Sequence, residues 1–285
     1  MCGIAGFLTQ GIHNPSSDLL QDMGEAIRHR GPDASATYLD DTVGLVHRRL
    51  SIIDLSEAGV QPMYSADKLC VIVFNGEIYN FQALREELVA DGYPFQSHTD
   101  TEVILALYQK EGIDCLAKLH GMFAFALWDL NTETLWLARD RIGKKPLYYY
   151  EKDEQFIFAS EIKAILTLPD IDRTIRDDAV YDFFAYQYVP DPKTIFSHMH
   201  KLAPGHVMKI QQGKKTINQY WDVSFANKTE SSLDVNTERL QTLLKEETKL
   251  RMLADVDLGA FLSGGVDSGG VVAMMAQQSD KPVKT

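Results

Sequence analysis

The sequence has no apolar run long enough to cross a membrane, so no transmembrane helix is predicted. Its first residues, MCGIAGFLTQGIHN, place no basic residue ahead of a short apolar run, and residue 2 is not the glycine of a myristoylation pattern. We therefore expect neither a signal peptide nor a lipid anchor, and no membrane as a partner.

Cysteine is scarce: Cys2, Cys70 and Cys115 lie far apart in the chain, and no CxxC motif occurs. An odd and scattered set of this kind argues against a disulfide framework and against a structural zinc site. A reducing, cytoplasmic environment suits these cysteines best, and no set of metal ligands is predicted.

Basic residues are fewer than acidic ones: the chain has 28 Lys plus Arg and 40 Asp plus Glu, which gives a formal net charge of -12. An acidic surface repels phosphate backbones, which disfavours nucleic acid as a partner. A nucleotide site is still allowed, since backbone N–H groups at the start of a helix bind phosphate without lysine. With 45% hydrophobic and 24% charged residues, the 285-residue chain has the composition of one large or two ordinary globular domains.

The N-terminal part of the chain, residues 2–211, alternates short apolar runs with segments of helical periodicity. Two pairs of apolar runs are each joined by a short polar turn, which indicates two adjacent antiparallel hairpins. Helices grouped between such hairpins are typical of an α+β layer architecture. The predicted elements are a buried strand over 69–74, helices that begin after Asn80 and after Asp100, and hairpins over 122–140 and 146–160.

Residues 212–236 are polar and show no clear period, so we interpret them as a linker. Beyond it, residues 237–285 begin with a leucine-rich helix, followed by an apolar strand at 256–262, a glycine-rich loop at 263–268 and another helix. A strand, a glycine-rich turn and a helix in this order open an α/β domain. So few elements cannot cover both faces of a parallel sheet, and the second domain is therefore expected to be incomplete.

Cys2 follows the initiator methionine directly, so removal of Met1 would give it both a thiol and a free α-amine. The thiolate is the nucleophilic form, and an α-amine that titrates near ~7.7–8.0 can accept the thiol proton close to neutral pH. Cys2 is therefore a candidate N-terminal nucleophile. By position alone, a small buried cysteine is the commoner interpretation.

The segment FNGEIYN, residues 74–80, contains candidates for an oxyanion site, whose donors are commonly a side-chain amide and a backbone N–H. Asn75 offers the amide and Gly76 the N–H. Asn-Gly is also the preferred pair for a tight hairpin turn, and taken alone that interpretation has the greater weight.

An amino-acid substrate also needs partners for its α-carboxylate and its α-ammonium. Arg49 can fork onto a carboxylate, while Asp100 and Glu77 can meet an ammonium group. The alternatives are a solvated basic strand end for Arg49 and a helix N-cap for Asp100.

Several longer segments occur in a fixed order: MCGIAGF, RHRGPD, RRLSIID, FNGEIYNF, DTEVIL, GMFAFALWD, ARDRIGKKPLYY, FASEIKAI and finally SGGVDS. Together they resemble the motifs of the glutamine-dependent asparagine synthetases, in their longer bacterial form, over nearly the whole chain. The resemblance implies a class II glutaminase domain with the αββα sandwich of N-terminal nucleophile hydrolases. It also implies that the start of an α/β ATP-pyrophosphatase domain follows.

The resemblance assigns roles to the residues at matching positions. It implies Cys2 as the nucleophile, with Asn75 and Gly76 as the oxyanion donors. The implied glutamine-binding residues are Arg49, Leu50, Ser51, Ile52, Ile53, Asn75, Gly76, Glu77 and Asp100.

The hexapeptide SGGVDS, residues 263–268, lies between a predicted strand and a predicted helix, where N–H groups and hydroxyls can face a phosphate. The first three residues alone would indicate no more than an ordinary strand-to-helix turn. Gly269 stands where the family usually has a second serine, so one hydroxyl donor is missing. The resemblance implies an ATP site, with Mg²⁺ as the accompanying ion, formed by Leu262, Ser263, Gly264, Gly265, Asp267 and Ser268.

The implied function is the ATP-dependent transfer of ammonia from glutamine to adenylated aspartate, which gives asparagine, glutamate, AMP and pyrophosphate. Glutamine, aspartate and ATP are then the partners, and a homodimer is compatible with this function. Two alternatives stay open. One is a related amidotransferase with a different carboxylate acceptor, of the kind associated with exopolysaccharide or export systems, since the acceptor pocket is expected beyond residue 285. The other is a glutaminase or glutamine-binding module alone.

We expect the 285-residue polypeptide to release glutamate from glutamine but no pyrophosphate from ATP, because residues 237–285 hold too few elements to close a sheet. A glutamate assay, and a pyrophosphate assay with aspartate, ATP, Mg²⁺ and ammonia, measure the two activities. Robust pyrophosphate release would contradict the expected incompleteness. A chain cut near residue 211 should be at least as soluble and as active on glutamine.

Overall fold

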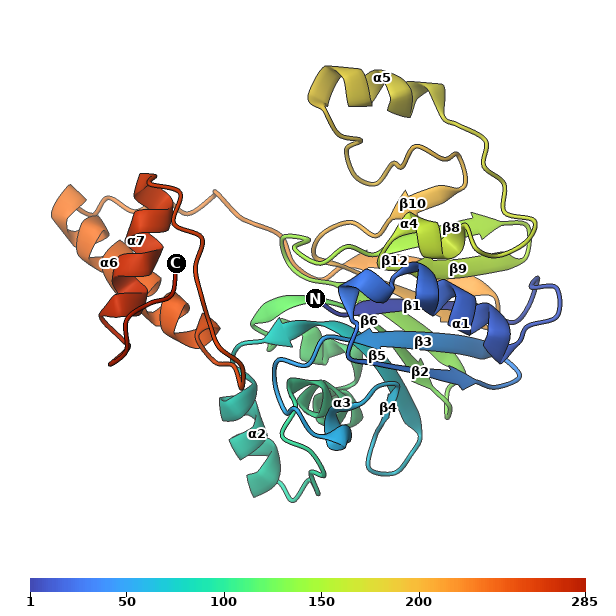
Figure 1. The fold of residues 1–285 in the computed structure, drawn as a ribbon, viewed down its shortest axis with the longest axis horizontal. Helices are drawn as coiled ribbons and strands as arrows, with labels where there is room; N and C mark the ends of the chain where they lie inside the picture. Colours follow the sequence, from blue (N-terminus) through green and yellow to red (C-terminus); the bar gives the residue numbers. More distant parts are fainter. The chain divides into compact units, whose positions relative to one another are not determined.

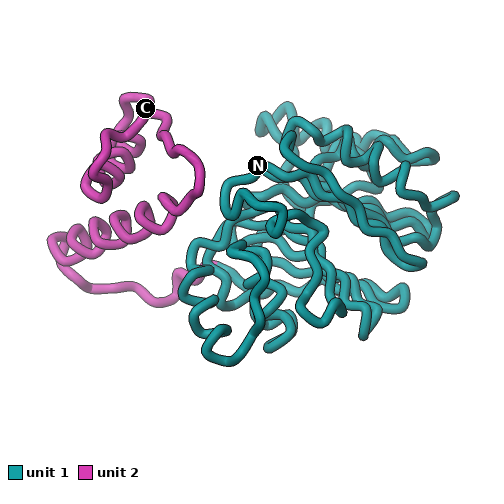
Figure 2. Tube along the Cα trace, turned by 60° about the horizontal axis from the view of Figure 1, so that its bottom comes forward, with its two compact units in different colours: residues 1–222 teal, residues 223–285 magenta.

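The computed structural model describes residues 1–285 as two compact units, Met1–Asp222 and Val223–Thr285 (Figure 2). None of the helices combines the length and the apolar character needed to cross a membrane.

The first unit is built on two six-stranded antiparallel sheets (Figure 1). The strands of the first sheet, in spatial order, are β10 (Met199–Lys201), β8 (Tyr148–Lys152), β9 (Gln155–Ala159), β1 (Gly3–Leu8), β3 (Val43–Arg49) and β2 (Ala34–Leu39). Those of the second sheet are β12 (Lys214–Gln219), β11 (His206–Gln211), β7 (Thr134–Arg139), β6 (Gly121–Asp129), β5 (Cys70–Ile78) and β4 (Met63–Tyr64).

Helices cover the outer face of each sheet. The outer face of the first sheet packs on α1 (Ser17–Ala26) and α4 (Ile162–Ile165), and that of the second packs on α2 (Phe81–Ala90) and α3 (Asp100–Glu111). A further helix, α5 (Asp177–Tyr186), and three short 3-10 helices, η1 (Arg28–Arg30), η2 (Glu57–Gly59) and η3 (Gly112–Ala117), complete the unit.

The strands alternate their side chains between two apolar layers, which fixes the order of the layers. On β5, Ile72 and Phe74 belong to the core under α2 and α3, whereas Val71 and Val73 belong to the core between the sheets. On the other side of the sandwich, Phe7 of β1 packs with α1 and α4. The four layers form the predicted αββα sandwich, so the predicted fold class is confirmed.

Several predicted elements are confirmed in place. The two hairpins are β6–β7 and β8–β9, and α2 begins after Asn80 and buries Phe81, Leu84 and Leu88. The side chain of Asn80 does not cap that helix, because it binds the His120 N–H and the Lys118 carbonyl instead.

The predicted linker over 212–236 is wrong for its first part. Residues Lys214–Gln219 form β12, which pairs with β11 along its whole length at the edge of the second sheet. The strand is exposed on nearly every residue, so its sequence carries no alternation of apolar and polar side chains that would indicate a strand. Tyr220 then anchors the end of the unit, since its hydroxyl donates to the Arg139 carbonyl at 2.8 Å.

The second unit contains two helices, α6 (Leu233–Arg251) and α7 (Val266–Ala276), which pack on each other. The strand predicted at 256–262 is wrong: the segment makes one isolated bridge, Gly259 to Lys284, and Phe261 is fully exposed. A strand needs neighbours for its backbone groups, and an apolar sequence alone does not supply them.

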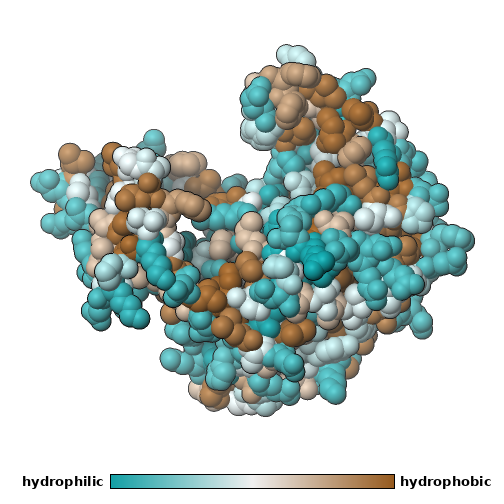
Figure 3. Space-filling view, in the orientation of Figure 1, coloured by the Kyte–Doolittle hydropathy of each residue, from teal (hydrophilic) through white to brown (hydrophobic).

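The exposed aromatic residues gather on α5 and just beyond it, and Figure 3 shows apolar side chains over this helix. Tyr181 and Phe184 are each 75% exposed, and Ala179 is the one buried residue of the helix. The helix therefore contributes little to the core of its unit.

The structure reverses the expectation for a chain cut near residue 211: we predict that residues 1–222 keep the full stability of the first unit and that residues 1–211 do not. The shorter chain loses β12 and the Tyr220 anchor, which leaves β11 with an open hydrogen-bonding edge. Its melting temperature should fall by at least about 4 °C relative to the 1–222 chain, and it should aggregate more readily. Thermal unfolding of the two chains under the same conditions measures this difference; equal melting temperatures would show that β12 is dispensable.

Candidate active site

A cavity collects the ends of several elements of the first unit. Its walls come from the start of β1, the ends of β3 and β5, and the first turn of α3, with one residue from the segment before β8. The lining residues are Met1, Cys2, Arg49, Leu50, Ile52, Ile53, Gly59, Gln61, Phe74, Asn75, Gly76, Glu77, Thr99, Asp100, Thr101 and Lys145.

The cavity brings together the residues predicted for a glutamine site, with one exception. Ser51 is not part of its wall, and the Ser51 N–H donates to the Asp33 carboxylate at 2.8 Å. Lys145, Gly59, Gln61, Thr99 and Thr101 line the cavity without having been predicted. Thr101 and Lys145 lie within the segments DTEVIL and ARDRIGKKPLYY without a predicted role, whereas Gly59, Gln61 and Thr99 lie outside the quoted segments.

Cys2 lies just before β1, a central strand of the first sheet, with its thiol against the backbone of Leu50. The thiol donates to the Leu50 carbonyl at 3.6 Å, and the Leu50 N–H donates to Sγ at 3.4 Å. Burial raises the pKa of the Cys2 thiol, and the Leu50 hydrogen bond opposes that rise. The Arg30 Nε fixes the main chain by donating to the Cys2 carbonyl at 2.9 Å.

Asn75 lies inside β5, opposite Ala124 of β6, so the interpretation of Asn-Gly as a hairpin turn is wrong. Its side chain is fully buried, and neither its amide nitrogen nor its amide oxygen has a hydrogen-bond partner. An unpaired buried amide costs about 1–3 kcal/mol, so this side chain does not stabilise the fold, and both of its polar atoms are free to bind a ligand. It lies on the wall of the cavity that also holds Cys2.

Gly76 points its backbone N–H away from β6. The residue opposite it, Phe123, donates its N–H to the Asp140 carboxylate, and its carbonyl accepts the Asp140 N–H. Gly76 and Phe123 are therefore a non-hydrogen-bonded pair. The Gly76 N–H points to the side of β5 that lies away from β6, where the cavity is. A Cβ at this position would lie 2.3 Å from the Met122 carbonyl, so the strand pairing requires glycine.

Arg49 is buried at the end of β3, which rules out a solvated strand end. Its Nη1 donates to the Ser56 carbonyl at 2.8 Å and its Nη2 donates to the Asp54 carbonyl. These bonds use two of its five N–H groups, which leaves donors for a carboxylate in the cavity. Gly59 makes room for the guanidinium, since a Cβ there would lie 2.1 Å from Nη2.

Asp100 is the first residue of α3, but Thr99 is the N-cap, with its hydroxyl accepting from the Glu102 N–H at 3.2 Å. The Asp100 carboxylate instead accepts the Ile78 N–H at 2.8 Å. Burial raises the pKa of Asp100 to about 7; the Ile78 hydrogen bond lowers it, and the nearby Glu77 raises it. A carboxylate that is buried without a cation invites an ammonium partner.

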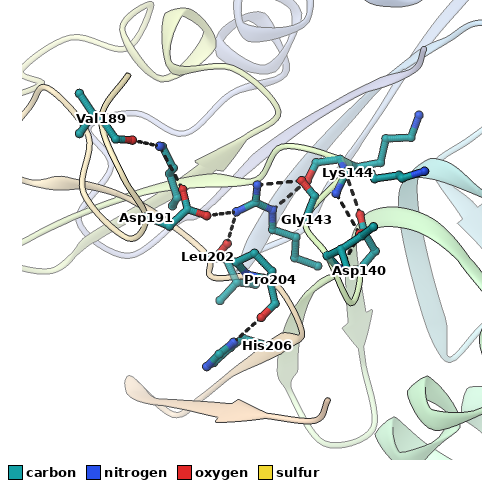
Figure 4. Close-up of polar contacts among 12 residues, drawn as sticks. Asp140, Gly143, Lys144, Val189, Asp191, Leu202, Pro204 and His206 are labelled. Carbon is teal, nitrogen blue, oxygen red and sulfur yellow. Dashed lines mark hydrogen bonds and ion pairs between the residues drawn. The ribbon is translucent and has the colours of Figure 1, made fainter. Parts of the chain in front are cut away.

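Lys145 lines the cavity, and two side chains hold the loop that precedes it. Figure 4 shows one of them, Asp140, beside Lys144. Asp140 accepts the Lys144 and Lys145 N–H groups, each at 2.9 Å. Arg139 donates to the Lys145 carbonyl at 2.9 Å and to the carbonyls of Gly143 and Leu202. Burial lowers the pKa of the Lys145 ammonium, while the proximity of Glu77 raises it.

The second unit carries the predicted phosphate loop. Gly265 is the N-cap of α7 and has no side-chain capping bond, and Gly264 has a φ of 84° with open space where a Cβ would lie. Ser263 and Ser268 bond to each other through their hydroxyls at 2.9 Å. The helix begins at Val266, within the segment predicted as a loop. No group of three His, Cys, Asp or Glu side chains that could hold a metal ion occurs in the chain.

Comparison with solved structures supports the fold. The glutamine phosphoribosylpyrophosphate amidotransferase from B. subtilis, solved with ADP and GMP, matches with a TM-score of 0.57 at 17% identity, over 96% of this chain and 64% of that one. The fold defines the class: an αββα sandwich of the kind found in a glutamine amidotransferase. The sequence profile of the glutamine amidotransferase domain matches residues 1–221, and the chain belongs to that family.

The sequence relatives extend the comparison to the second unit. The asparagine synthase profile matches residues 239–285. The chain is 38% identical over 289 residues to glutamine-hydrolyzing asparagine synthetase 1 of Bacillus subtilis, covering 100% of this chain and 45% of that protein. It is 37% identical to a putative glutamine-hydrolyzing asparagine synthetase 2 of Methanocaldococcus jannaschii, covering 98% and 58%. The chain thus spans about half the length of these curated relatives.

We predict that glutamine binds more weakly as the pH falls below about 7, the pKa of Asp100. Protonation removes the carboxylate charge that would face the ammonium group, so the Kd should rise about tenfold per pH unit below that point. Calorimetric titration of the Cys2→Ala variant with glutamine measures the Kd without turnover. Asp100→Asn should bind weakly at every pH between 5.5 and 8, about as weakly as the acid limit of the parent; a flat profile in the parent would exclude Asp100 from ammonium binding.

Proposed function

We propose that the first unit hydrolyses glutamine and that Cys2 is its nucleophile. The observation that carries this proposal is the buried Asn75 amide, which lacks a partner and lies on the wall of the cavity that contains Cys2. The Gly76 N–H, directed to the same cavity, supplies a second donor. A nucleophile and two donors around one cavity are what amide hydrolysis through a covalent intermediate requires.

The proposed reaction has two halves. After removal of Met1, the Cys2 α-amine takes the thiol proton and Sγ attacks the glutamine amide carbon. The oxyanion that forms accepts hydrogen bonds from the Asn75 amide and the Gly76 N–H. The Cys2 α-ammonium group then gives this proton to the amide nitrogen, the C–N bond breaks, ammonia leaves and a thioester remains. Water hydrolyses the thioester to glutamate and the free thiol.

Recognition of the substrate falls to the charged residues of the cavity. In the proposal, Arg49 binds the α-carboxylate with its remaining N–H groups, while Asp100 and Glu77 face the α-ammonium group. Leu50, Ile52 and Ile53 form the wall beside the thiol, and Ser51 shapes the segment through its bond to Asp33. Lys145 favours the thiolate, because its positive charge opposes the rise that burial causes in the pKa of Cys2.

For the protein that carries both units, we propose glutamine-dependent asparagine synthesis, in which ATP activates aspartate by adenylation. The supporting observation is the agreement of residues 239–285 with asparagine synthase, together with the names of the relatives. Leu262, which is exposed, is proposed as the residue that lies beside the nucleotide. Helix α7 has an uncapped N-terminus at Gly265, which suits a pyrophosphate group, with hydroxyls from Ser263 and Ser268. Mg²⁺ that travels with ATP uses one or two carboxylates and phosphate oxygens, and Asp267 in the first turn offers one carboxylate.

A cytoplasmic location belongs to the same proposal. Cys2, Cys70 and Cys115 are all free thiols, and a nucleophilic thiol needs reducing surroundings to stay active.

We predict that Cys2→Ala abolishes glutamate release, whereas Cys70→Ala and Cys115→Ala do not. The last two are matched controls, because burial raises the pKa of both thiols to about 12 and keeps them protonated. A chain made so that Met1 is retained should be as inactive as Cys2→Ala, since Cys2 then has no free α-amine. A coupled glutamate assay compares the four proteins with the parent; normal turnover with Met1 retained would rule out the α-amine as the base.

A further inference from the structure

The strand that carries Asn75 and Gly76 is longer than its neighbour. β4 pairs with β5 at two positions only, Met63 with Ile72 and Tyr64 with Val71. Beyond Ile72 the edge of β5 has no strand beside it, although the strand continues to Ile78. Because alternate residues point their N–H and C=O groups the same way, Phe74, Gly76 and Ile78 all present theirs at this open edge.

Side chains occupy the open edge on both sides of Gly76. At Phe74, the N–H donates to Gln61 Oε1 at 2.6 Å, and the carbonyl accepts from His47 Nε2 at 3.1 Å. At Ile78, the N–H donates to Asp100. The N–H groups of Phe74 and Ile78 are therefore bonded to side chains, and the Gly76 N–H between them faces the cavity.

His47 makes a connection between the two sheets. It lies on β3, opposite Ile4 of β1, the strand that Cys2 precedes. Its side chain crosses the sandwich to β5. The ring is 1% exposed, and burial lowers the pKa of His47 to about 3, with the Phe74 hydrogen bond opposing that shift. The imidazole is therefore neutral near pH 7, which suits a fixed donor.

Gln61, in the loop before β4, makes a second connection, which joins β5 to the helix layer. It is 5% exposed, and its Nε2 donates to Thr101 Oγ1 at 3.2 Å, in the first turn of α3. The same side chain thus ties Phe74 to the helix turn that holds Asp100.

We propose that His47 and Gln61 are positioning residues for the oxyanion site: by clamping both backbone groups of Phe74, they fix the place of the Asn75 amide and the Gly76 N–H relative to Cys2. This inference rests on the proposed glutamine hydrolysis. The clamp ties β5 to the sheet that carries the nucleophile and to the helix that carries Asp100. Oxyanion donors bind the transition state and not the ground-state substrate. Loss of the clamp should therefore lower kcat and change the affinity for glutamine little.

The test uses the full 285-residue chain with single substitutions on each side of the clamp. His47→Leu and Gln61→Met should lower kcat for glutamate release by ~10–100-fold, the range expected when reacting groups shift by a fraction of an ångström, with KM changed by less than about twofold. His47→Gln, which keeps an N–H donor at the matching atom, should recover most of the turnover. The pH profile of His47→Gln should keep the shape of the parent profile.

Ser65→Ala is the matched control. Ser65 is 2% exposed, and its Oγ accepts the Cys70 N–H of the same strand at 2.9 Å, at the end that lies away from the cavity. It should alter stability without altering kcat.

Coupling to Asn75 separates positioning from general damage to the fold. In the double variant His47→Leu with Asn75→Ala, kcat should fall by clearly less than the two single losses multiplied together, because the clamp acts partly through that amide and partly through the Gly76 N–H. Amide hydrogen exchange across residues 73–80 should be faster in His47→Leu and Gln61→Met and unchanged in Ser65→Ala. If His47→Leu does not fold, His47→Asn, whose side chain is too short to reach Phe74, takes its place.

Three results would overturn the inference: unchanged kcat in folded clamp variants, a loss of kcat in the double variant equal to the product of the two single losses, or equal losses in Ser65→Ala. A parent protein that releases no glutamate would instead refute the proposed function. The exchange experiment would then still decide whether the two side chains hold the strand, since unchanged exchange across residues 73–80 would overturn the clamp by itself.

Discussion

The active site depends on a mismatch in length between two neighbouring strands. β4 ends after two residues while β5 runs on, so part of β5 has no backbone partner on one side. Unpaired backbone groups at an edge are ordinarily a liability in a sheet. Here side chains from β3, the loop before β4 and α3 take up the groups at Phe74 and Ile78, and the position between them faces the cavity. The remaining features of the site are arranged around this stretch of strand.

Much of the fold could be predicted from the sequence where local patterns are sufficient. The hairpins β6–β7 and β8–β9 combine apolar runs with short polar turns, and α2 shows its buried face through Phe81, Leu84 and Leu88. β12 could not be predicted, because both of its faces are polar and only the neighbouring β11 makes it a strand. Residues 256–262 gave the opposite error: their apolar character predicted a strand, but one bridge to Lys284 is their only pairing.

The site shows the same division between local and long-range information. Motifs placed Cys2, Arg49, Asn75 and Asp100 correctly on one cavity. The hydrogen bonding of these side chains could not be predicted. The Asn75 amide faces the cavity and has no partner, and Thr99 rather than Asp100 caps helix α3. Lys145 lies within the segment ARDRIGKKPLYY, but no role was predicted for it, and His47 and Gln61 lie outside the quoted segments. Their contacts depend on Asp140, on Phe74 and on the packing of one sheet on the other.

The unpaired amide of Asn75 sets stability against the proposed catalysis at a single position. An apolar residue of similar volume would remove a desolvation penalty of about 1–3 kcal/mol from a fully buried site between two sheets. Laboratory evolution toward heat resistance alone would therefore favour the loss of this asparagine. Retention of Asn75 in a lineage is then a record of continuous selection for chemistry at the cavity, and its replacement by a branched aliphatic residue would mark a descendant that keeps the sandwich for another purpose.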